Sequence, residues 1–291
     1  MRLASYLKDG ATSYGIVTDR GIIDLASRLG DEAPTLKALI ASEFAGAAEL
    51  SDSAPDFGLD AVTLLPPIPE PGAIWCVGLN THTHFHEAAE RMGFKEVPQT
   101  PMFFLRAANT LVGSGSPIEK PALEPNFDYE GEIAVVIGRR CRNVSVADAP
   151  QHIAGFSCFN DGSARQYQIR SHQVTTGKNG YHRAGFGPWL VTADEIPPDR
   201  LSNDHLVLQT RVNGEIRQNM RLDDLIFSFA DLISHISEVT WLEPGDVLVT
   251  GSAEGAGALR NPQLFLAQGD VVEVEIDGIG TLSNTVLEQA L

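Results

Sequence analysis

Residues 124–139 read EPNFDYEGEIAVVIGR, and this stretch predicts an acidic segment that leads into a buried strand. The apolar run at 132–137 has the length of a strand buried inside a sheet. Alternate side chains of a strand point to the same face, so Glu130 and Glu132 can converge on one point. Two carboxylates that close repel each other unless a cation or a proton lies between them. The stretch indicates either a metal site or, as the alternative, solvent-facing residues on an acidic protein.

A further acidic position lies in residues 155–168, GFSCFNDGSARQYQ. Here Asp161 follows an apolar run, at the point where a strand gives way to a polar loop. Carboxylate oxygens are hard ligands, which favour Mg²⁺, Mn²⁺ or Ca²⁺ over zinc. This segment therefore adds a third candidate carboxylate to the pair formed by Glu130 and Glu132.

Most of the chain beyond residue 70 predicts strands. Residues 74–79, IWCVGL, suit a buried strand, and two hairpins are indicated at 207–217 and 271–285 by their Asn-Gly and Asp-Gly turns. One helix is predicted from apolar residues at helical spacing, namely Leu222, Leu225, Ile226, Phe229, Leu232, Ile233 and Ile236. Hairpins with few helices favour a mainly β, α+β class over a doubly wound α/β fold.

The first 65 residues predict a small separate unit. Short strands at ASYL and SYGIVTD are broken at Lys8-Asp9-Gly10 and Asp19-Arg20-Gly21, and an Ala-rich helical stretch runs to about residue 50. Residues 66–71, PPIPEP, have the composition of a stiff linker. We therefore expect an α+β N-terminal domain at 1–65 and a catalytic domain at 66–291.

Composition narrows the class of protein. The chain has 291 residues and a net charge of −17, which argues against nucleic acid or an anionic membrane as a partner. An anionic substrate would need a local cation. The three cysteines form no CxxC pair, so neither a disulfide framework nor a zinc knuckle is predicted. No signal peptide or membrane-spanning run is apparent, and a cytoplasmic enzyme is expected.

Four segments in order resemble the fumarylacetoacetate hydrolase family. They are EPNFDYEGEIAVVIGR, GFSCFNDGSARQYQ, GPWLVTADEI at 187–196 and PGDVLVTGSAEGAG at 244–257. The resemblance covers roughly residues 70–291, and the N-terminal unit resembles the family's small variable domain more loosely. It implies a mixed β-sandwich or roll catalytic domain, a homodimer and a 2-oxo acid substrate.

The resemblance also implies a metal site. Its ligands would be Glu130, Glu132 and Asp161, and its ion Mg²⁺, with Mn²⁺ or Ca²⁺ as alternatives. Three carboxylates on Mg²⁺ leave about three octahedral positions for substrate or water. Asp128 receives no ligand role, and we expect it either behind the ligands or on the surface.

The histidine-rich stretch Thr81–Glu87, THTHFHE, has two interpretations. Its THxH pattern suggests a metallo-β-lactamase zinc site, but the Asp that should follow and the later ligand motifs are missing. The resemblance implies instead a catalytic dyad of His84 and Glu87, which share a helix face at i, i+3. Glu87 would fix the tautomer of His84 and raise the basicity of its other nitrogen. His82 and His86 are alternatives for the catalytic histidine, or else line the substrate site or the surface.

The resemblance assigns roles to four further residues. Lys178 would be catalytic, supplying positive charge where an oxyanion or enolate develops. Three residues would bind substrate, namely Arg106, Gln168 and Ser252. A surface or dimer-contact arginine is the alternative for Arg106. Residues 179–186 depart from the family pattern, which makes Tyr181, His182 and Arg183 candidates for substrate specificity.

The predicted reaction is metal-assisted cleavage of a 2,4-dioxo acid. The dyad would activate water to attack the distal carbonyl of an acylpyruvate or a diketo-deoxy sugar acid, which yields a pyruvate-type product and a carboxylic acid. Two alternatives use the same site, a hydroxymuconate-type isomerase and an oxaloacetate decarboxylase. A non-catalytic binder of small acids is a hypothesis from another class, and the presence of both ligand set and dyad argues against it.

Overall fold

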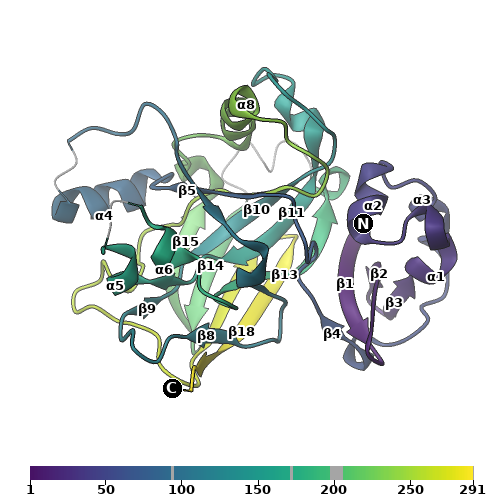
Figure 1. Cartoon of the computed structure of the whole chain (residues 1–291), viewed down its shortest axis with the longest axis horizontal. Coiled ribbons are helices and arrows are strands. Elements are labelled where there is room, and N and C mark those ends of the chain that lie inside the picture. The colour runs from purple at the N-terminus through teal and green to yellow at the C-terminus, as the bar shows by residue number, and fades with distance from the viewer. Residues whose placement is uncertain (93–94, 171–172, 197–205, 291) are drawn as a thin grey trace.

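A computed structural model describes residues 1–92, 95–170, 173–196 and 206–290 of the chain, and it is built mainly from β-strands (Figure 1). The largest sheet has eleven strands. Nine of them form the path β3 (Gly21–Asp24), β2 (Ala11–Thr18), β1 (Arg2–Lys8), β13 (Ala184–Thr192), β11 (Ile153–Asn160), β10 (Gly131–Ile137), β16 (Val247–Val249), β5 (Ile74–Gly78) and β6 (Met102–Arg106). Off this path, β4 (Thr63–Leu64) pairs with β1, and β7 (Leu111–Val112) pairs with β13.

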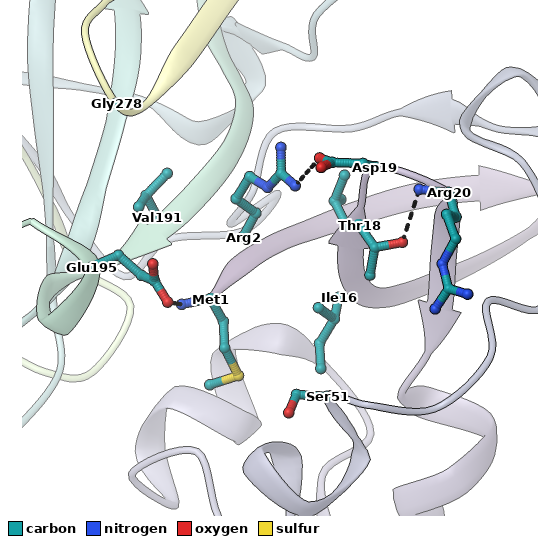
Figure 2. Close-up of a pocket in the computed structure, with 11 residues that line it drawn as sticks. Met1, Arg2, Ile16, Thr18, Asp19, Arg20, Ser51, Val191, Glu195 and Gly278 are labelled. Atoms are coloured by element: carbon teal, nitrogen blue, oxygen red, sulfur yellow. Dashed lines mark hydrogen bonds and ion pairs between the residues drawn. The ribbon is translucent and has the colours of Figure 1, made fainter.

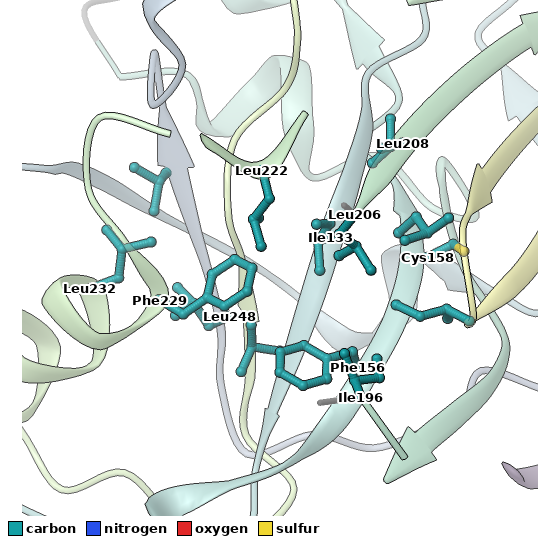
Figure 3. Close-up of a cluster of buried hydrophobic side chains, with 14 of the residues drawn as sticks. Ile133, Phe156, Cys158, Ile196, Leu206, Leu208, Leu222, Phe229, Leu232 and Leu248 are labelled. Atoms are coloured by element: carbon teal, nitrogen blue, oxygen red, sulfur yellow. The ribbon is translucent and has the colours of Figure 1, made fainter. Parts of the chain in front are cut away.

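A second sheet packs against the first. Its order is β15 (Glu215–Arg221), β14 (Val207–Val212), β17 (Val271–Ile276), β18 (Gly280–Glu288) and β8 (Ile118–Lys120). Both predicted hairpins are therefore confirmed. Figure 3 shows part of the apolar cluster between the layers, where Ile133 and Phe156 from the large sheet meet Leu208 from the second and Phe229 from a helix. The mainly β class is confirmed, and the two layers form a sandwich around this core.

The helices are short and lie outside the sheets. In the described part of the chain they are α1 (Ala26–Leu29), α2 (Leu36–Ala41), α3 (Ala47–Leu50), α4 (His82–Met92), α5 (Arg165–Gln168), α6 (Thr175–Lys178) and α8 (Phe229–Val239). None of the helices in the described ranges is both long and apolar enough to cross a membrane.

The helix predicted from Leu222 onward begins seven residues later than expected. Ser228 and Asp231 form a capping box, in which each side chain accepts the other's backbone N–H, so the helix starts at Phe229. Leu222 is buried but belongs to a short 3₁₀ turn. The prediction of helix from Leu222 to Ile226 was therefore wrong. The apolar spacing there arises because the residues form a turn that packs against the core.

The N-terminal residues share the large sheet with the rest of the chain. Strand β1 pairs with β13 through Arg2 and Leu3, and one buried cluster joins Leu3 to Phe159 and Phe186. Residues 66–71, predicted as a linker, lie against the body, since Ser5 Oγ donates to the Pro67 carbonyl at 2.7 Å. The division at residue 65 stays a prediction.

A cavity of about 780 Å³ lies beside β1 and β2 of the large sheet, near the end of β13 (Figure 2). The Met1 amino group pairs with Glu195 at 3.0 Å, and Arg2 pairs with Asp19 at 2.6 Å. This cavity shares no lining residue with the cavity that contains the predicted metal ligands.

Candidate active site

The three predicted ligands come together through the pairing of β10 with β11. Gly131 lies opposite Asn160, so Glu130, just before β10, is next to Asp161, just after β11. The Asp161 N–H donates to the Glu130 carbonyl at 2.7 Å. Carboxylate oxygens of Glu130, Glu132 and Asp161 lie within 4.8 Å of one another, and all three residues are buried. The predicted convergence is confirmed, and these residues are called the carboxylate triad below.

Buried cations offset most of this negative charge. Lys178, at the end of α6, pairs with both Glu130 and Asp161. Burial alone would lower the pKa of Lys178, but the two carboxylates outweigh it and raise the pKa, so the amine stays charged. Arg106, at the end of β6, pairs with Asp161.

Arg165 is a site residue that was not predicted, although it lies within the segment at 155–168. It opens α5 and bridges Glu130 at 2.8 Å and Asp128 at 2.7 Å. Burial alone would raise the pKa of Glu130, but Arg165 and Lys178 hold it well below its usual range. An arginine in a polar loop directly after a predicted buried strand was the available signal.

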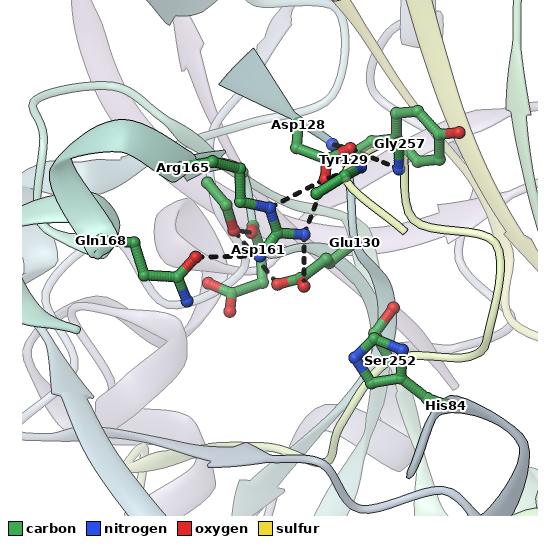
Figure 4. A network of polar contacts seen from close by, with 12 residues as sticks. His84, Asp128, Tyr129, Glu130, Asp161, Arg165, Gln168, Ser252 and Gly257 are labelled. Atoms are coloured by element: carbon green, nitrogen blue, oxygen red, sulfur yellow. Dashed lines mark hydrogen bonds and ion pairs between the residues drawn. The ribbon is translucent and has the colours of Figure 1, made fainter. Parts of the chain in front are cut away.

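Asp128 is fully buried and supports the site from behind. Its carboxylate accepts N–H groups of Tyr129 at 2.9 Å, Gly257 at 2.8 Å and Ala258 at 2.9 Å, besides its pair with Arg165. Figure 4 shows it beside Gly257. Of the two positions expected for Asp128, the surface one is excluded. The residue fixes the acidic segment to the Gly-rich loop.

Glu132 has no ion pair among the described residues. Its contact is with the Gly251 N–H, which donates to Oε2 at 2.5 Å. Burial and the neighbouring carboxylates of Asp161 and Glu130 raise its pKa well above the usual range. The site has one more buried carboxylate than it has paired cations: the carboxylates are Asp128, Glu130, Glu132 and Asp161, and the cations are Arg106, Arg165 and Lys178. A divalent cation among these hard oxygen ligands would supply the missing positive charge. The donor set therefore fits Mg²⁺ or Mn²⁺.

The predicted dyad lies on α4. His84 Nδ1 is 3.4 Å from a Glu87 carboxylate oxygen, and Glu87 also accepts the Gly255 N–H at 3.1 Å. Figure 4 shows the His84 ring facing the open space beside Glu130. The alternatives His82 and His86 are exposed and do not line the cavity. His84 is thus the histidine of this stretch that the fold brings to the carboxylate triad.

The start of α4 is held by distant segments. The Asp224 carboxylate accepts the Thr83 N–H at 3.3 Å and its hydroxyl, which satisfies donors that a helix N-terminus leaves free. The Asn80 side chain donates to the carbonyls of Phe227 at 3.0 Å and Thr250 at 2.7 Å. The dyad is therefore positioned by contacts with residues 224–227 and with the end of β16.

A cavity of about 1370 Å³ opens onto the carboxylate triad. Eight of the nine predicted site residues line it, namely His84, Arg106, Glu130, Glu132, Asp161, Gln168, Lys178 and Ser252. The ninth, Glu87, stands behind His84. The Nη2 atom of Arg106 is buried without a hydrogen-bond partner in the structure. An unpaired buried guanidinium nitrogen is costly, which makes it a candidate contact for an anionic ligand.

Two predicted substrate contacts are already bonded within the protein. The Gln168 side-chain oxygen accepts from Arg165 at 3.0 Å, and Ser252 Oγ accepts from Gln218 at 2.7 Å. Gln218, which the sequence argument missed, also accepts the Gly131 N–H at 2.9 Å. It lies in an ordinary hairpin strand, and no local pattern distinguishes it.

The three specificity candidates of residues 179–186, Tyr181, His182 and Arg183, do not line the cavity. Of this loop, Asn179 lines the cavity, while Tyr181 stacks on His182 and His182 lies near Glu119. Arg183 is buried beneath Gly180 and does not line the cavity. The preceding segment with Val174 and Thr175 lines the cavity instead, because α6 is the element that carries Lys178 inward.

Comparisons with known proteins identify the family. Residues 73–287 match the model described as the fumarylacetoacetate (FAA) hydrolase C-terminal domain. The chain is 38% identical to "Oxaloacetate tautomerase YisK" of Bacillus subtilis, over 79% of this chain and 75% of that protein. It is 37% identical to the mitochondrial oxaloacetate tautomerase Fahd2a of Rattus norvegicus, over 78% and 70%.

Solved structures agree. Fumarylacetoacetate hydrolase from Exiguobacterium antarcticum has a TM-score of 0.85 at 32% identity, covering 99% of this chain and all of that chain. Maleylpyruvate hydrolase from Sphingobium sp. SYK-6, in complex with manganese(II) and pyruvate, has a TM-score of 0.81 at 26% identity, with both chains fully covered. The chain belongs to the fumarylacetoacetate hydrolase family, whose members are enzymes that act on small molecules.

Proposed function

We propose that this chain is a metal-dependent enzyme that interconverts the keto and enol forms of a 2-oxo acid, with His84 as the proton carrier. The observation that carries the proposal is the position of His84, which lines one cavity with the carboxylate triad and faces the space beside Glu130, while its Nδ1 lies 3.4 Å from Glu87. Relatives named as tautomerases, isomerases and hydrolases support it, because reactions of these kinds on 2-oxo acids can share one proton transfer beside the 2-oxo group.

The carboxylate triad would hold the cation, Mg²⁺ or Mn²⁺, with Ca²⁺ as a further possibility. Bound there, it would supply Lewis-acid stabilisation of the negative charge that develops on the 2-oxo group. Arg106 would bind the substrate carboxylate through Nη2, the guanidinium nitrogen that has no partner in the structure. Lys178 would add a fixed positive charge beside the same group.

The proton would move through the dyad. Because a carboxylate can only accept a hydrogen bond, the contact with Glu87 favours the tautomer with the proton on His84 Nδ1, which would leave the other ring nitrogen to act as a base. That nitrogen would remove a proton from the carbon next to the 2-oxo group, so that a C–H bond breaks and an enolate forms. Return of the proton to oxygen completes the enol, with no change of oxidation state. Glu87 would stabilise the imidazolium in between.

Hydrolysis of a 2,4-dioxo acid, the reaction predicted first from the sequence, is the second candidate. The cavity volume of about 1370 Å³ favours it, because it leaves space for an acyl group and an attacking water beside the 2-oxo acid. The same His84 nitrogen would then deprotonate water. The two reactions differ in product, since hydrolysis releases pyruvate and a second carboxylic acid.

One assay tests both. Oxaloacetate and 2,4-dioxopentanoate would be supplied as enols with Mg²⁺ or Mn²⁺, while loss of enol absorbance and formation of pyruvate are followed separately. We expect metal-dependent enol loss that Glu130→Gln abolishes and His84→Asn reduces at least 100-fold. Pyruvate and acetate formed from 2,4-dioxopentanoate at the same rate would assign hydrolysis. Enol loss no faster than in buffer, with both substrates and both metals, would refute the proposal.

A further inference from the structure

We infer that the substrate carries an extended uncharged apolar tail beyond its 2-oxo acid head, and that strand β6 sets the path of this tail. The inference rests on the proposed function, because it takes the carboxylate triad as the place of the head. It adds the class of substrate, a 2-oxo acid with a long alkyl or aryl substituent.

Strand β6 changes from charged to apolar with distance from the carboxylate triad. Arg106, Phe104 and Met102 occupy alternate positions and therefore share one face, and all three line the cavity. Arg106 is buried against Asp161, and the Phe104 ring centroid lies 5.4 Å from Lys178 Nζ. Met102, at the far end, is 49% exposed. A ligand anchored at Arg106 would therefore pass over apolar side chains as it extends outward.

The neighbouring strand leaves space along this path. Gly78 on β5 lies opposite Met102 on β6, so both point to the same face of the sheet. A Cβ atom added to Gly78 would have only Met102 near it, with the terminal methyl carbon at 3.7 Å, which is ordinary contact. The surface here is an open strip rather than a filled wall.

Apolar side chains are also exposed at the mouth of the cavity. Ile169, directly after α5, is 79% exposed, and Leu105, on the other face of β6 from Met102, is 50% exposed. Both line the cavity, together with Leu259 and Phe265. Clustered exposed apolar residues on a soluble surface mark ligand or partner sites, and these are continuous with the catalytic cavity. We therefore assign them to the substrate tail.

The charges in the cavity argue against a second anionic end. Among the described lining residues, the lysine and arginine side chains are Arg106, Arg165 and Lys178. Each already pairs with a carboxylate of the acidic segment or with Asp161. Besides apolar side chains, the described lining includes uncharged amides such as Gln173 and Gln263. A carboxylate at the far end of the substrate would therefore meet no further described cation, at a desolvation cost.

The apolar strip along β6 is longer than a four-carbon acid. The four residue steps from Arg106 to Met102 span about 13 Å at roughly 3.3 Å per residue. A four-carbon chain covers only about 4 Å of this, given carbon–carbon bonds of about 1.5 Å. The cavity volume of about 1370 Å³ also exceeds the roughly 300–1,000 Å³ of ordinary small-molecule sites. A tail of roughly six to eight carbons, or an aromatic ring, fills the strip.

Calorimetry with simple 2-oxo acids, whose keto–enol interconversion leaves no net product, measures the contribution of the tail to affinity. In the presence of Mg²⁺, the full chain would be titrated with pyruvate, 2-oxohexanoate, 2-oxooctanoate and 2-oxooctanedioate. The last has the same chain length as 2-oxooctanoate but ends in a second carboxylate. We expect affinity to rise about two- to fourfold per methylene from pyruvate to 2-oxooctanoate. The dicarboxylate should bind at least tenfold more weakly than 2-oxooctanoate.

A matched pair of variants locates the effect. Ile169→Gln changes an exposed residue of the cavity mouth, and Val239→Gln changes one that is 75% exposed at the end of α8, outside the cavity. We expect Ile169→Gln, and likewise Met102→Gln, to lower the ratio of 2-oxooctanoate to pyruvate affinity at least threefold. Val239→Gln should leave the ratio unchanged.

The outcomes separate the inference from the proposed function. The inference of an apolar tail would be overturned if affinity did not depend on tail length, or if the dicarboxylate bound most tightly. In that case the proposed function would still stand if pyruvate binding depended on Mg²⁺ and was lost in Glu130→Gln. Absence of Mg²⁺-dependent binding for every 2-oxo acid would overturn both. A length dependence that Ile169→Gln and Met102→Gln leave intact would overturn the role of β6.

Discussion

The backbone N–H of Gly255 donates to the carboxylate of Glu87 at 3.1 Å, which ties the helix with the proposed catalytic histidine to the Gly-rich loop after β16. That loop also contacts the carboxylate triad, since Gly251 donates to Glu132, and it contacts the supporting residue Asp128, to which Gly257 donates. One loop therefore positions both the proposed proton carrier and the proposed metal ligands, so a change in its backbone should affect both.

Gly255→Ala tests this link. Gly255 has φ of +95°, and a Cβ atom there would lie 2.2 Å from the Arg217 carbonyl oxygen, so the loop must move. We expect kcat to fall roughly 100-fold through misplacement of Glu87. Gly214→Ala is the control, because Gly214 also has positive φ but a Cβ there meets nothing within 4 Å. Equal activity in the two variants would contradict the role of the Gly255 contact.

Glu87→Gln removes the charge of the dyad and keeps a hydrogen-bond acceptor for Gly255. We expect kcat to fall about 100-fold, because the imidazolium of His84 loses its counter-ion, while KM changes little. The pH–rate profile should lose or shift its acidic limb, which a purely structural effect would not do. Glu238→Gln, at an exposed position of α8, is the control. An unchanged profile with full activity would remove Glu87 from the mechanism.

Asp128→Asn should destabilise the fold, because it leaves Arg165 with one buried carboxylate instead of two. Breaking a buried ion pair costs about 3 kcal/mol, which lowers the midpoint of thermal unfolding by roughly 6–12 °C for a chain of this size. Asp223→Asn breaks an exposed pair with Arg221 and should cost less than about 0.5 kcal/mol. Calorimetric unfolding of both variants measures the difference, and similar small costs would contradict the structural role of Asp128.

The three cysteines should be inert in the folded protein. All are buried, and burial raises the pKa of Cys158 to about 12 and the pKa of Cys76 well above its usual range. A raised pKa means less thiolate at pH 8, and the thiolate is the reactive form. An aromatic disulfide reagent should therefore label none of the three in native protein and all three in denaturant. Rapid labelling of native protein would contradict this burial.

The sequence predicted those parts of the site that depend on local order. Strand alternation placed Glu130 and Glu132 together, and the family resemblance supplied His84 and Asp161. Gln218 escaped prediction because its contacts with Gly131 and Ser252 join segments 34 or more residues apart. Such contacts follow from how two sheets pack, which no local pattern encodes.

The errors have physical causes of the same kind. Apolar spacing from Leu222 to Ile226 imitates a helix, but the capping box at Ser228 decides where α8 begins. The unusual loop at 179–186 suggested specificity, yet Tyr181, His182 and Arg183 do not line the cavity, and His182 lies near Glu119 instead. A chemically unusual segment in the sequence does not by itself show which way its side chains point in the folded protein.

The measurement that tests the central claim most directly is Mn²⁺ binding to the wild type and to Glu132→Gln, followed by electron paramagnetic resonance of free Mn²⁺. Glu132 is the buried carboxylate of the triad without an ion pair among the described residues, so its charge is the one that a cation would balance. We predict one Mn²⁺ per wild-type chain and an affinity at least 100-fold weaker in Glu132→Gln. Equal affinity in the two proteins would contradict the carboxylate triad as the metal site.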